Sequence, residues 1–167
     1  MTGRQAFDLK TYEERSKHAP CFICEIVAGN PAYEHHVIYD DDATIAFLNK
    51  YPTLYGYVLV APKEHREGAT ADFTLDEYLA LQSVIYRVAQ AIQRVVVTER
   101  MYILSLGSQQ GNRHVHWHLA PLPPGVPYAE QQLAALSFER GVLDMSAEGK
   151  AALAGRIRQA LKEMDIG

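Results

Sequence analysis

Apolar and β-branched residues gather in short runs that predict several strands. Residues 36–49 contain two such runs, joined by an acidic turn at Asp40–Asp42. Residues 55–62 (YGYVLVAP) form a further apolar run, which ends at Pro62 because proline has no backbone N–H to donate. Residues 100–108 (RMYILSLGS) predict another strand later in the chain.

Two other segments repeat their apolar residues at the spacing of an α-helix. Residues 73–95 are the clearer case, because Thr74 and Glu77 form the S/T-x-x-E pattern of a capping box at the start of a helix. Residues 145–164 predict a closing helix with Ser146 as its cap. The apolar positions at helical spacing are Leu75, Tyr78, Leu79, Leu81 and Ile85 in the first segment, and Ala151, Leu153, Ile157 and Leu161 in the second.

The order of these segments predicts the fold class. Strands, one long helix and returning strands are typical of an α+β fold with a mainly antiparallel sheet, one long helix and a C-terminal helix. A chain of 167 residues is long enough for one domain with its own core. We divide it into a polar leader at 1–18, helical at most, a central domain at 19–125, and a C-terminal extension at 126–167 whose helix packs on the same domain.

Three of the seven histidines stand at alternate positions in the segment 114–120 (HVHWHLA). Successive side chains of a β-strand point to opposite faces, so His114, His116 and His118 would share one face of a strand. The pattern therefore predicts a row of imidazoles that opens onto a site, with an apolar face behind it. The residues of that apolar face are Val115, Trp117 and Leu119.

Two chemistries suit such a row. The imidazoles could ligate a catalytic metal that also holds a water molecule. Alternatively, one imidazole could attack phosphorus while its neighbours bind the phosphate oxygens. The small, glycine-containing turn before the histidines favours the phosphate, because such a turn can present backbone N–H groups to an anion. No Asp or Glu lies between Met101 and Tyr128 to orient the imidazoles of a metal triad.

Composition limits the partners of this site. A formal net charge of −4 and a sequence pI near 6.0 argue against non-specific binding of nucleic-acid polymers. A local pocket can still hold a small anion. No apolar run approaches the ~18 residues of a membrane span, and the polar N-terminus has no apolar signal core. We therefore expect a cytoplasmic protein without a membrane partner.

The segment HVHWHLA resembles the signature H-φ-H-φ-H-φ-φ of the histidine triad (HIT) family of nucleotide hydrolases and transferases, and it matches that signature in full. Residues 21–49 and 56–65 follow the layout and order of the same family, so the resemblance extends from Cys21 to about Pro124. It implies that 19–125 is a HIT domain, commonly a homodimer. It also implies cleavage at the α-phosphorus of nucleoside 5′-phosphoryl compounds through a nucleotidyl-histidine intermediate.

The resemblance implies a role for each matching position. His116, the middle histidine, would be the nucleophile, and His114 and His118 would orient it and contact the phosphate. Asn49 falls where the family places an Asp or Asn that holds the ribose hydroxyls. Further nucleotide-binding residues would be Ile45 and Phe47 around the base, for which plain core packing is an equal alternative, and Ser108, Gly111 and Asn112 around the phosphate.

The two cysteines of the motif CFIC suggest a second site. In a reducing compartment such a pair is metal-binding, redox-active or incidental. The pair resembles that of zinc-carrying HIT proteins, in which a histidine after the PK block and the first triad histidine complete the site. This resemblance implies a structural zinc held by Cys21, Cys24, His65 and His114. The alternative is two buried, reduced cysteines.

The chain departs from the family pattern near the expected nucleophile. Tyr57 stands where members usually carry a histidine, so a phenol replaces that support or the support is absent. The loop before the triad is short, which leaves Ser108 or Asn112 to contact the phosphate. Dinucleoside polyphosphates and adenosine phosphoramidates are both suitable substrates, with adenine implied by the family. Two rival functions stay open: a nucleotide-binding regulatory module with little turnover, and a metal-dependent hydrolase that uses the three histidines as ligands.

Overall fold

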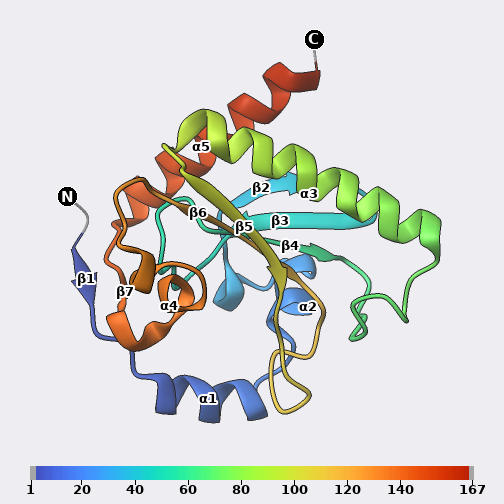
Figure 1. Ribbon diagram of the computed structural model, residues 1–167. Helices are drawn as coiled ribbons and strands as arrows, with labels where there is room; N and C mark the ends of the chain where they lie inside the picture. The colour runs from blue at the N-terminus through green and yellow to red at the C-terminus, as the bar shows by residue number, and fades with distance from the viewer. Residues whose placement is uncertain (1–2, 166–167) are drawn as a thin grey trace.

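The computed structural model describes residues 3–165, which form a five-stranded antiparallel sheet with helices on both faces (Figure 1). The strands of this sheet are β2 (Val37–Asp40), β3 (Thr44–Leu48), β4 (Val58–Pro62), β5 (Arg100–Ser105) and β6 (Trp117–Leu122). The helices are α1 (Leu9–His18), α2 (Phe22–Val27), α3 (Leu75–Val95), α4 (Leu133–Leu136) and α5 (Ala147–Asp165). This architecture confirms the predicted α+β class.

The sheet order is β2-β3-β4-β6-β5, and every neighbouring pair is antiparallel. The acidic turn joins β2 to β3 as predicted, with the Asp41 carboxylate accepting the backbone N–H groups of Ala43 and Thr44. The long helix α3 follows β4, after which β5 runs along the outer side of β6. This topology places β4 and β6, which flank the expected site, side by side at the centre of the sheet, with Leu59 opposite His118.

Successive side chains of each strand point to opposite faces of the sheet, so the apolar residues form two cores, one on each face. The face covered by α3 and α5 carries Ile38, Ala46, Leu48, Val58, Val60, Trp117 and Leu119. The opposite face carries Ile45, Phe47, Leu59, Ala61, Ala120 and Leu122, which pack with Ile23 of α2 and Ala135 of α4. His118 lies on this second face, because it alternates with Trp117 and Leu119 along β6. The fold thus leaves the second face for the site.

The two long helices begin at the predicted caps. Thr74 Oγ1 accepts the backbone N–H of Glu77, whose carboxylate accepts the N–H of Thr74, so the capping box is complete. Ser146 Oγ accepts the N–H of Gly149 at the start of α5. Not every residue at helical spacing faces the core: Leu81, Ile85, Leu153, Ile157 and Leu161 are buried, whereas Leu75, Leu79 and Ala151 are exposed. Over residues 3–165, none of the helices combines the length and the apolar character needed to cross a bilayer.

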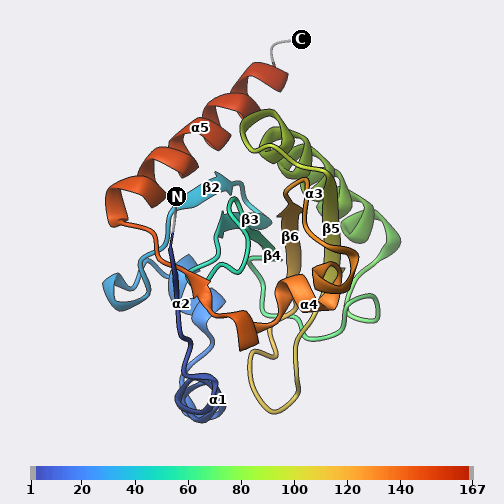
Figure 2. The ribbon, with the colours of Figure 1, turned by 60° about the vertical axis from the view of Figure 1, so that its left-hand side comes forward.

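The leader and the C-terminal extension meet on one side of the molecule (Figure 2). Strand β1 (Arg4–Gln5) pairs antiparallel with β7 (Val142–Leu143), and the Arg4 guanidinium donates to the carbonyl oxygens of Gly141 and Thr53. Helix α1 follows β1 and begins at Asp8, whose carboxylate accepts the N–H of Thr11. These contacts hold α1 beside the central domain.

The prediction of one strand through all three triad histidines is wrong for the first two. Strand β6 begins at Trp117, so His114 and His116 precede it. Between His114 and His116 the backbone does not pair with a strand of the sheet, since the N–H of Val115 donates to the carbonyl of Arg66 at 2.7 Å. The carbonyl of His116 accepts from the Ser105 hydroxyl at 2.8 Å, which ends the ladder with β5. Of the three histidines, only His118 therefore lies in a strand.

Candidate active site

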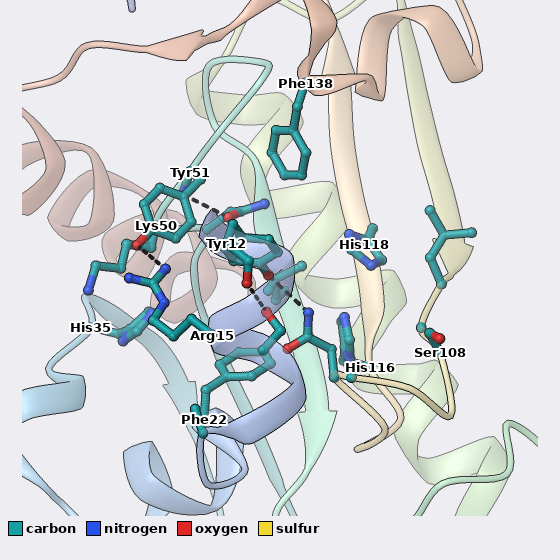
Figure 3. A pocket seen from close by; sticks show the side chains of 18 of the residues that line it. Tyr12, Arg15, Phe22, His35, Lys50, Tyr51, Ser108, His116, His118 and Phe138 are labelled. Carbon is teal, nitrogen blue, oxygen red and sulfur yellow. Dashed lines mark hydrogen bonds between the residues drawn. The ribbon is translucent and has the colours of Figure 1, made fainter. Parts of the chain in front are cut away.

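A cavity of about 340 Å³ opens on the face of the sheet away from α3 and α5 (Figure 3). This volume suits a small ligand such as a nucleotide. None of the described residues that line it is Asp or Glu, while Arg15 and Lys50 contribute positive charge. Six of the predicted site residues line the cavity together, namely His116, His118, Asn49, Ser108, Gly111 and Asn112. His114, Ile45 and Phe47 are not among its lining residues.

His116 presents a basic nitrogen to the cavity. Its Nδ1 lies 2.7 Å from the carbonyl oxygen of His114. A carbonyl oxygen only accepts hydrogen bonds, so Nδ1 carries the proton and Nε2 keeps its lone pair. Burial lowers the pKa of His116, which keeps the ring neutral near pH 7. His116 therefore has the tautomer and charge of a nitrogen nucleophile.

His118 has the opposite tautomer. Its Nδ1 lies 2.9 Å from the hydroxyl of Tyr57, which has no other hydrogen bond among the described residues. Burial raises the pKa of Tyr57, so the phenol keeps its proton and donates it to Nδ1. The imidazole proton then lies on Nε2, a buried atom, and a hydrogen bond to the Leu106 backbone opposes the effect of burial on the pKa of the ring. Burial also lowers the pKa of His118 to about 3.

His114 belongs to a different cluster. Its Nε2–H donates to the carbonyl oxygen of Pro62 at 2.8 Å, which leaves the lone pair on Nδ1. That nitrogen lies 3.3 Å from Cys21 Sγ and 3.5 Å from Cys24 Sγ. Burial lowers the pKa of His114 to about 4, so the ring is neutral. The first triad histidine is thus turned toward the cysteines and away from the cavity.

The residues Cys21, Cys24, His65 and His114 could hold a metal ion. One ligand atom from each residue lies within 4.8 Å of all the others. His65 repeats the arrangement of His114: its Nδ1 lies 3.3 Å from Cys24 Sγ, and its Nε2 lies 3.2 Å from a carboxylate oxygen of Glu67. Histidine ligands of metals commonly donate their second N–H to such an acceptor. The cluster supports the four ligands that the resemblance implied.

The turn before the triad lines the cavity opposite the sheet. Asn112 has a positive φ of 57°, and the N–H of Gly111 donates to the carbonyl of Ser108 at 3.1 Å. Across the cavity, Asn49 Oδ1 accepts the backbone N–H of Tyr51 at 3.0 Å. Its amide nitrogen has no described partner, so a polar ligand can still receive a donor from Asn49.

Ile45 and Phe47 lie in the core instead of the cavity wall. Both are buried, and Phe47 is fully so. Phe47 packs behind the wall, with its ring centroid 6.3 Å from that of Phe22 and 5.2 Å from that of His35, and both of these residues line the cavity. Ile45 and Phe47 are therefore core residues, which was the alternative to a place around the base, because strand β3 is covered on both faces.

The family model of the HIT domain matches residues 30–124, which is more than half of the chain. The chain belongs to the HIT family. A fission yeast (Schizosaccharomyces pombe) HIT protein named adenosine 5′-monophosphoramidase is 27% identical over 133 residues, covering 71% of this chain and 94% of the relative. An uncharacterised HIT-like protein of Mycobacterium tuberculosis is 29% identical over 153 residues, covering 87% of this chain and 96% of the relative.

The fold matches solved HIT structures. A zinc-bound histidine triad family protein of Mycobacterium smegmatis superposes with a TM-score of 0.69 at 24% identity, covering 87% of this chain and 96% of that chain. Such a likeness supports the fold assignment.

Several cavity residues lie outside the segment that matches the HIT domain, and sequence analysis missed them. Tyr12, Arg15 and Ser16 come from α1, and Phe138 comes from the C-terminal extension. His35, which lies inside the matched segment, also lines the cavity and has a pKa lowered by burial. No motif announces these residues, because their contacts join segments far apart in the chain.

Proposed function

We propose that this HIT protein is an enzyme that cleaves nucleoside 5′-phosphoryl compounds at the α-phosphorus, as a hydrolase or a nucleotidyl transferase. The observation that carries the proposal is the pair of complementary tautomers in the cavity. His116 carries its lone pair on Nε2, whereas His118 carries an N–H on Nε2. A nucleophile and a donor on one cavity wall are what a phosphoryl displacement needs.

The chemistry divides into two displacements at phosphorus. Nε2 of His116 forms a bond to the α-phosphorus as the bond to the leaving group breaks, and the electron pair stays with the leaving group. The carbonyl of His114 accepts the Nδ1–H of His116 and stabilises the positive charge that develops on the ring. His118 donates its Nε2–H to an oxygen of the reacting phosphate. Water, or another acceptor, then displaces the nucleotide from His116.

The rest of the cavity supports binding of the nucleotide. The turn containing Ser108, Gly111 and Asn112 can offer backbone and side-chain donors to the phosphate. Asn49 is available for the ribose hydroxyls, and the absence of carboxylates among the described lining residues avoids repulsion of an anion. Phe22, whose ring centroid lies 5.9 Å from that of His116, offers an aromatic surface for the base. The name of the fission yeast relative supports an adenine nucleotide as the substrate.

We also propose a structural zinc ion bound to the cluster of Cys21, Cys24, His65 and His114. Tetrahedral zinc with sulfur and nitrogen ligands separates neighbouring ligand atoms by about 3.3–3.8 Å. The sulfur–nitrogen distances of 3.3, 3.3 and 3.5 Å fit this range. When bound, zinc would tie the N-terminal part of the domain to the triad segment. The bound zinc of the M. smegmatis structure supports the same identity.

A homodimer is the oligomeric state that we propose. Strand β5 lies at one end of the sheet, with β6 as its partner on the inner side. Ile103 on this strand and Leu133 beside it are exposed apolar residues, and a cavity of about 750 Å³ lies between their segments. A second copy would cover this edge. Sedimentation of the wild type and of Ile103→Lys tests the proposal, since the charge should favour the monomer.

The rival metal-dependent hydrolase receives less support. Within residues 3–165 the metal-binding cluster includes His114 but neither His116 nor His118. The three triad histidines therefore do not converge on one point. The rival nucleotide-binding module differs from our proposal only in turnover, so an activity assay separates the two.

The deciding experiment measures nucleotide release from diadenosine polyphosphates, an adenosine phosphoramidate and an aminoacyl-adenylate. Wild type is compared with His116→Ala and with His18→Ala, which removes an exposed histidine that does not line the cavity. We expect release by the wild type and His18→Ala but not by His116→Ala, with a nucleotidyl adduct on His116 in quenched wild type. Tight nucleotide binding without release from any substrate would favour the binding module.

A further inference from the structure

Helix α1 forms a wall of the cavity, although it lies before the segment that matches the HIT domain. Two contacts join α1 to the turn before the triad. Asn112 Nδ2 donates to the hydroxyl of Tyr12 at 2.9 Å, across 100 positions of the chain. Gly111 approaches Ser16 so closely that a Cβ at Gly111 would lie 3.2 Å from the Ser16 carbonyl oxygen. The helix is thus held against the turn that we propose for phosphate binding.

An aromatic cluster also fixes α1 in place. The Phe7 and Phe138 rings stack with centroids 4.2 Å apart, and Tyr12 packs edge-on against Tyr51 at 5.7 Å. These rings come from the leader, the loop after β3 and the C-terminal extension. The contacts anchor α1 to two other parts of the protein, so the wall belongs to the folded structure.

Arg15 is the charged residue of this wall. Its guanidinium donates to the Tyr51 hydroxyl at 3.0 Å and lies over the rings of Tyr12 and Tyr51, 5.6 and 5.9 Å from their centroids. Among the residues that the structure describes, no carboxylate forms an ion pair with it. A guanidinium has five N–H groups, so most of its donors are available to a ligand. The aromatic rings hold the positive charge in place before any ligand binds.

Arg15 lies on the side of the cavity opposite His116 and His118. Figure 3 shows Arg15, Tyr51 and Lys50 on one side and His116 and His118 on the other. In a displacement at phosphorus the attacking and leaving atoms are roughly in line, on opposite sides of the phosphorus. A leaving group displaced by His116 therefore departs toward the wall that carries Arg15.

We propose that α1 is the leaving-group subsite of this enzyme and that Arg15 binds a phosphate of the leaving group. This inference rests on the proposed function and specifies which substrates it favours: those whose leaving group carries negative charge, such as a phosphate chain, over those that release an uncharged amine. As His116 bonds to the α-phosphorus, the bridging P–O bond breaks and its electron pair stays on the departing phosphate oxygen. Arg15 binds that anion through its N–H groups, and no proton transfer is required.

The test compares two substrates that share the adenosine 5′-phosphoryl group, diadenosine tetraphosphate and adenosine 5′-phosphoramidate. The variants are Arg15→Gln, Arg15→Lys and Lys10→Gln, which removes a positive charge from an exposed α1 residue that does not line the cavity. We expect Arg15→Gln to lower the ratio of kcat/KM for the tetraphosphate to kcat/KM for the phosphoramidate about tenfold, as for loss of one charged hydrogen bond. Arg15→Lys should restore part of the ratio, and Lys10→Gln should not change it.

A binding measurement separates this inference from the proposed activity. In the His116→Ala background, Arg15→Gln should weaken binding of ATP about tenfold relative to binding of AMP, because only ATP has phosphates beyond the α position. An unchanged ATP-to-AMP ratio, or an equal change in Arg15→Gln and Lys10→Gln, would overturn the role of Arg15. If the wild type binds ATP and AMP but releases nucleotide from no substrate, the proposed catalysis is wrong. The ATP-to-AMP binding ratio then still tests whether Arg15 binds the phosphates beyond the α position. A wild type that binds neither nucleotide would overturn both.

Discussion

Tyr57 and His118, which stand 61 positions apart in the chain, share a hydrogen bond of 2.9 Å beside the cavity. The phenol thus takes over a position where HIT proteins usually carry a histidine, but its contact is with the third triad histidine. By donating to Nδ1, Tyr57 sets the tautomer that places the ring proton of His118 on Nε2. The departure from the family pattern therefore keeps a supporting hydrogen bond.

Tyr57→Phe should lower kcat for nucleotide release about two- to tenfold, because one neutral hydrogen bond that fixes His118 is lost. KM should change little, since Tyr57 orients His118 and is not among the residues that line the cavity. Tyr55→Phe is the control, as its hydroxyl accepts from Arg156 away from the cavity. A rise in KM with unchanged kcat would contradict this positioning role.

Acid should destabilise the fold through His118. Burial holds its pKa at about 3, well below the ordinary value of 6.5. The unfolded chain therefore binds a proton below about pH 6.5 while the folded chain does not, so stability decreases as the pH falls from about 6.5 toward 3. Between pH 7 and pH 5 this amounts to about 2 kcal/mol of the free energy of unfolding.

Urea unfolding of the wild type and of His118→Gln at both pH values measures this effect. Glutamine does not titrate, so the variant should lose about 2 kcal/mol less on acidification than the wild type. Other titrating groups are common to both proteins and cancel in the comparison. Equal losses in the two proteins would show that His118 is not the acid-sensitive group.

Cys24→Ser should abolish stoichiometric zinc and lower the unfolding temperature, because a structural metal contributes directly to folding. Elemental analysis of protein produced with added zinc measures the metal content. Burial and the neighbouring Cys21 raise the pKa of the Cys24 thiol to about 11, so zinc binding must displace this proton and should strengthen as the pH rises. Zinc content below stoichiometric in the wild type would exclude the proposed site.

Glu67→Gln should weaken zinc binding without removing a zinc ligand. The Glu67 carboxylate accepts from Nε2 of His65, and loss of such a partner weakens metal binding by about tenfold or more. Glu64→Gln is the matched control, because the Glu64 side chain pairs with Arg66 and has no described hydrogen bond to a side chain of the proposed ligands. Zinc affinity measured by competition with a chelator should fall in the first variant and stay unchanged in the second.

Two glycine-to-alanine substitutions should change stability in opposite directions. Gly111→Ala brings a methyl group 3.2 Å from the Ser16 carbonyl oxygen and should displace α1, exposing the leader to protease. Gly155→Ala lies within α5, where the new Cβ meets nothing closer than 3.8 Å, and should stabilise the fold by about 0.5–1 kcal/mol. Limited proteolysis and urea unfolding measure the two effects. Rapid cleavage of the leader in the wild type would contradict the anchoring of α1.

Sequence patterns predicted turns and helix starts correctly where these are stabilised by hydrogen bonds between nearby residues. The acidic turn between β2 and β3 and the capping box of Thr74 and Glu77 involve residues within three positions of each other, so both are visible in the sequence. The histidine segment was harder. Its alternation predicted a strand, but hydrogen bonds to Arg66 and Ser105, both distant in sequence, take its first half out of the sheet.

The sequence by itself determined the HIT family, the α+β class and the residue types of both sites, because motifs and periodicity are properties of neighbouring residues. The resemblance already grouped His114 with the cysteines, but tertiary structure alone decided that His114 does not line the cavity whereas His116 and His118 do. It also brought Arg15 of the leader and Phe138 of the extension to the cavity wall. Those placements depend on packing and on hydrogen bonds between segments 100 or more positions apart, which no local pattern encodes.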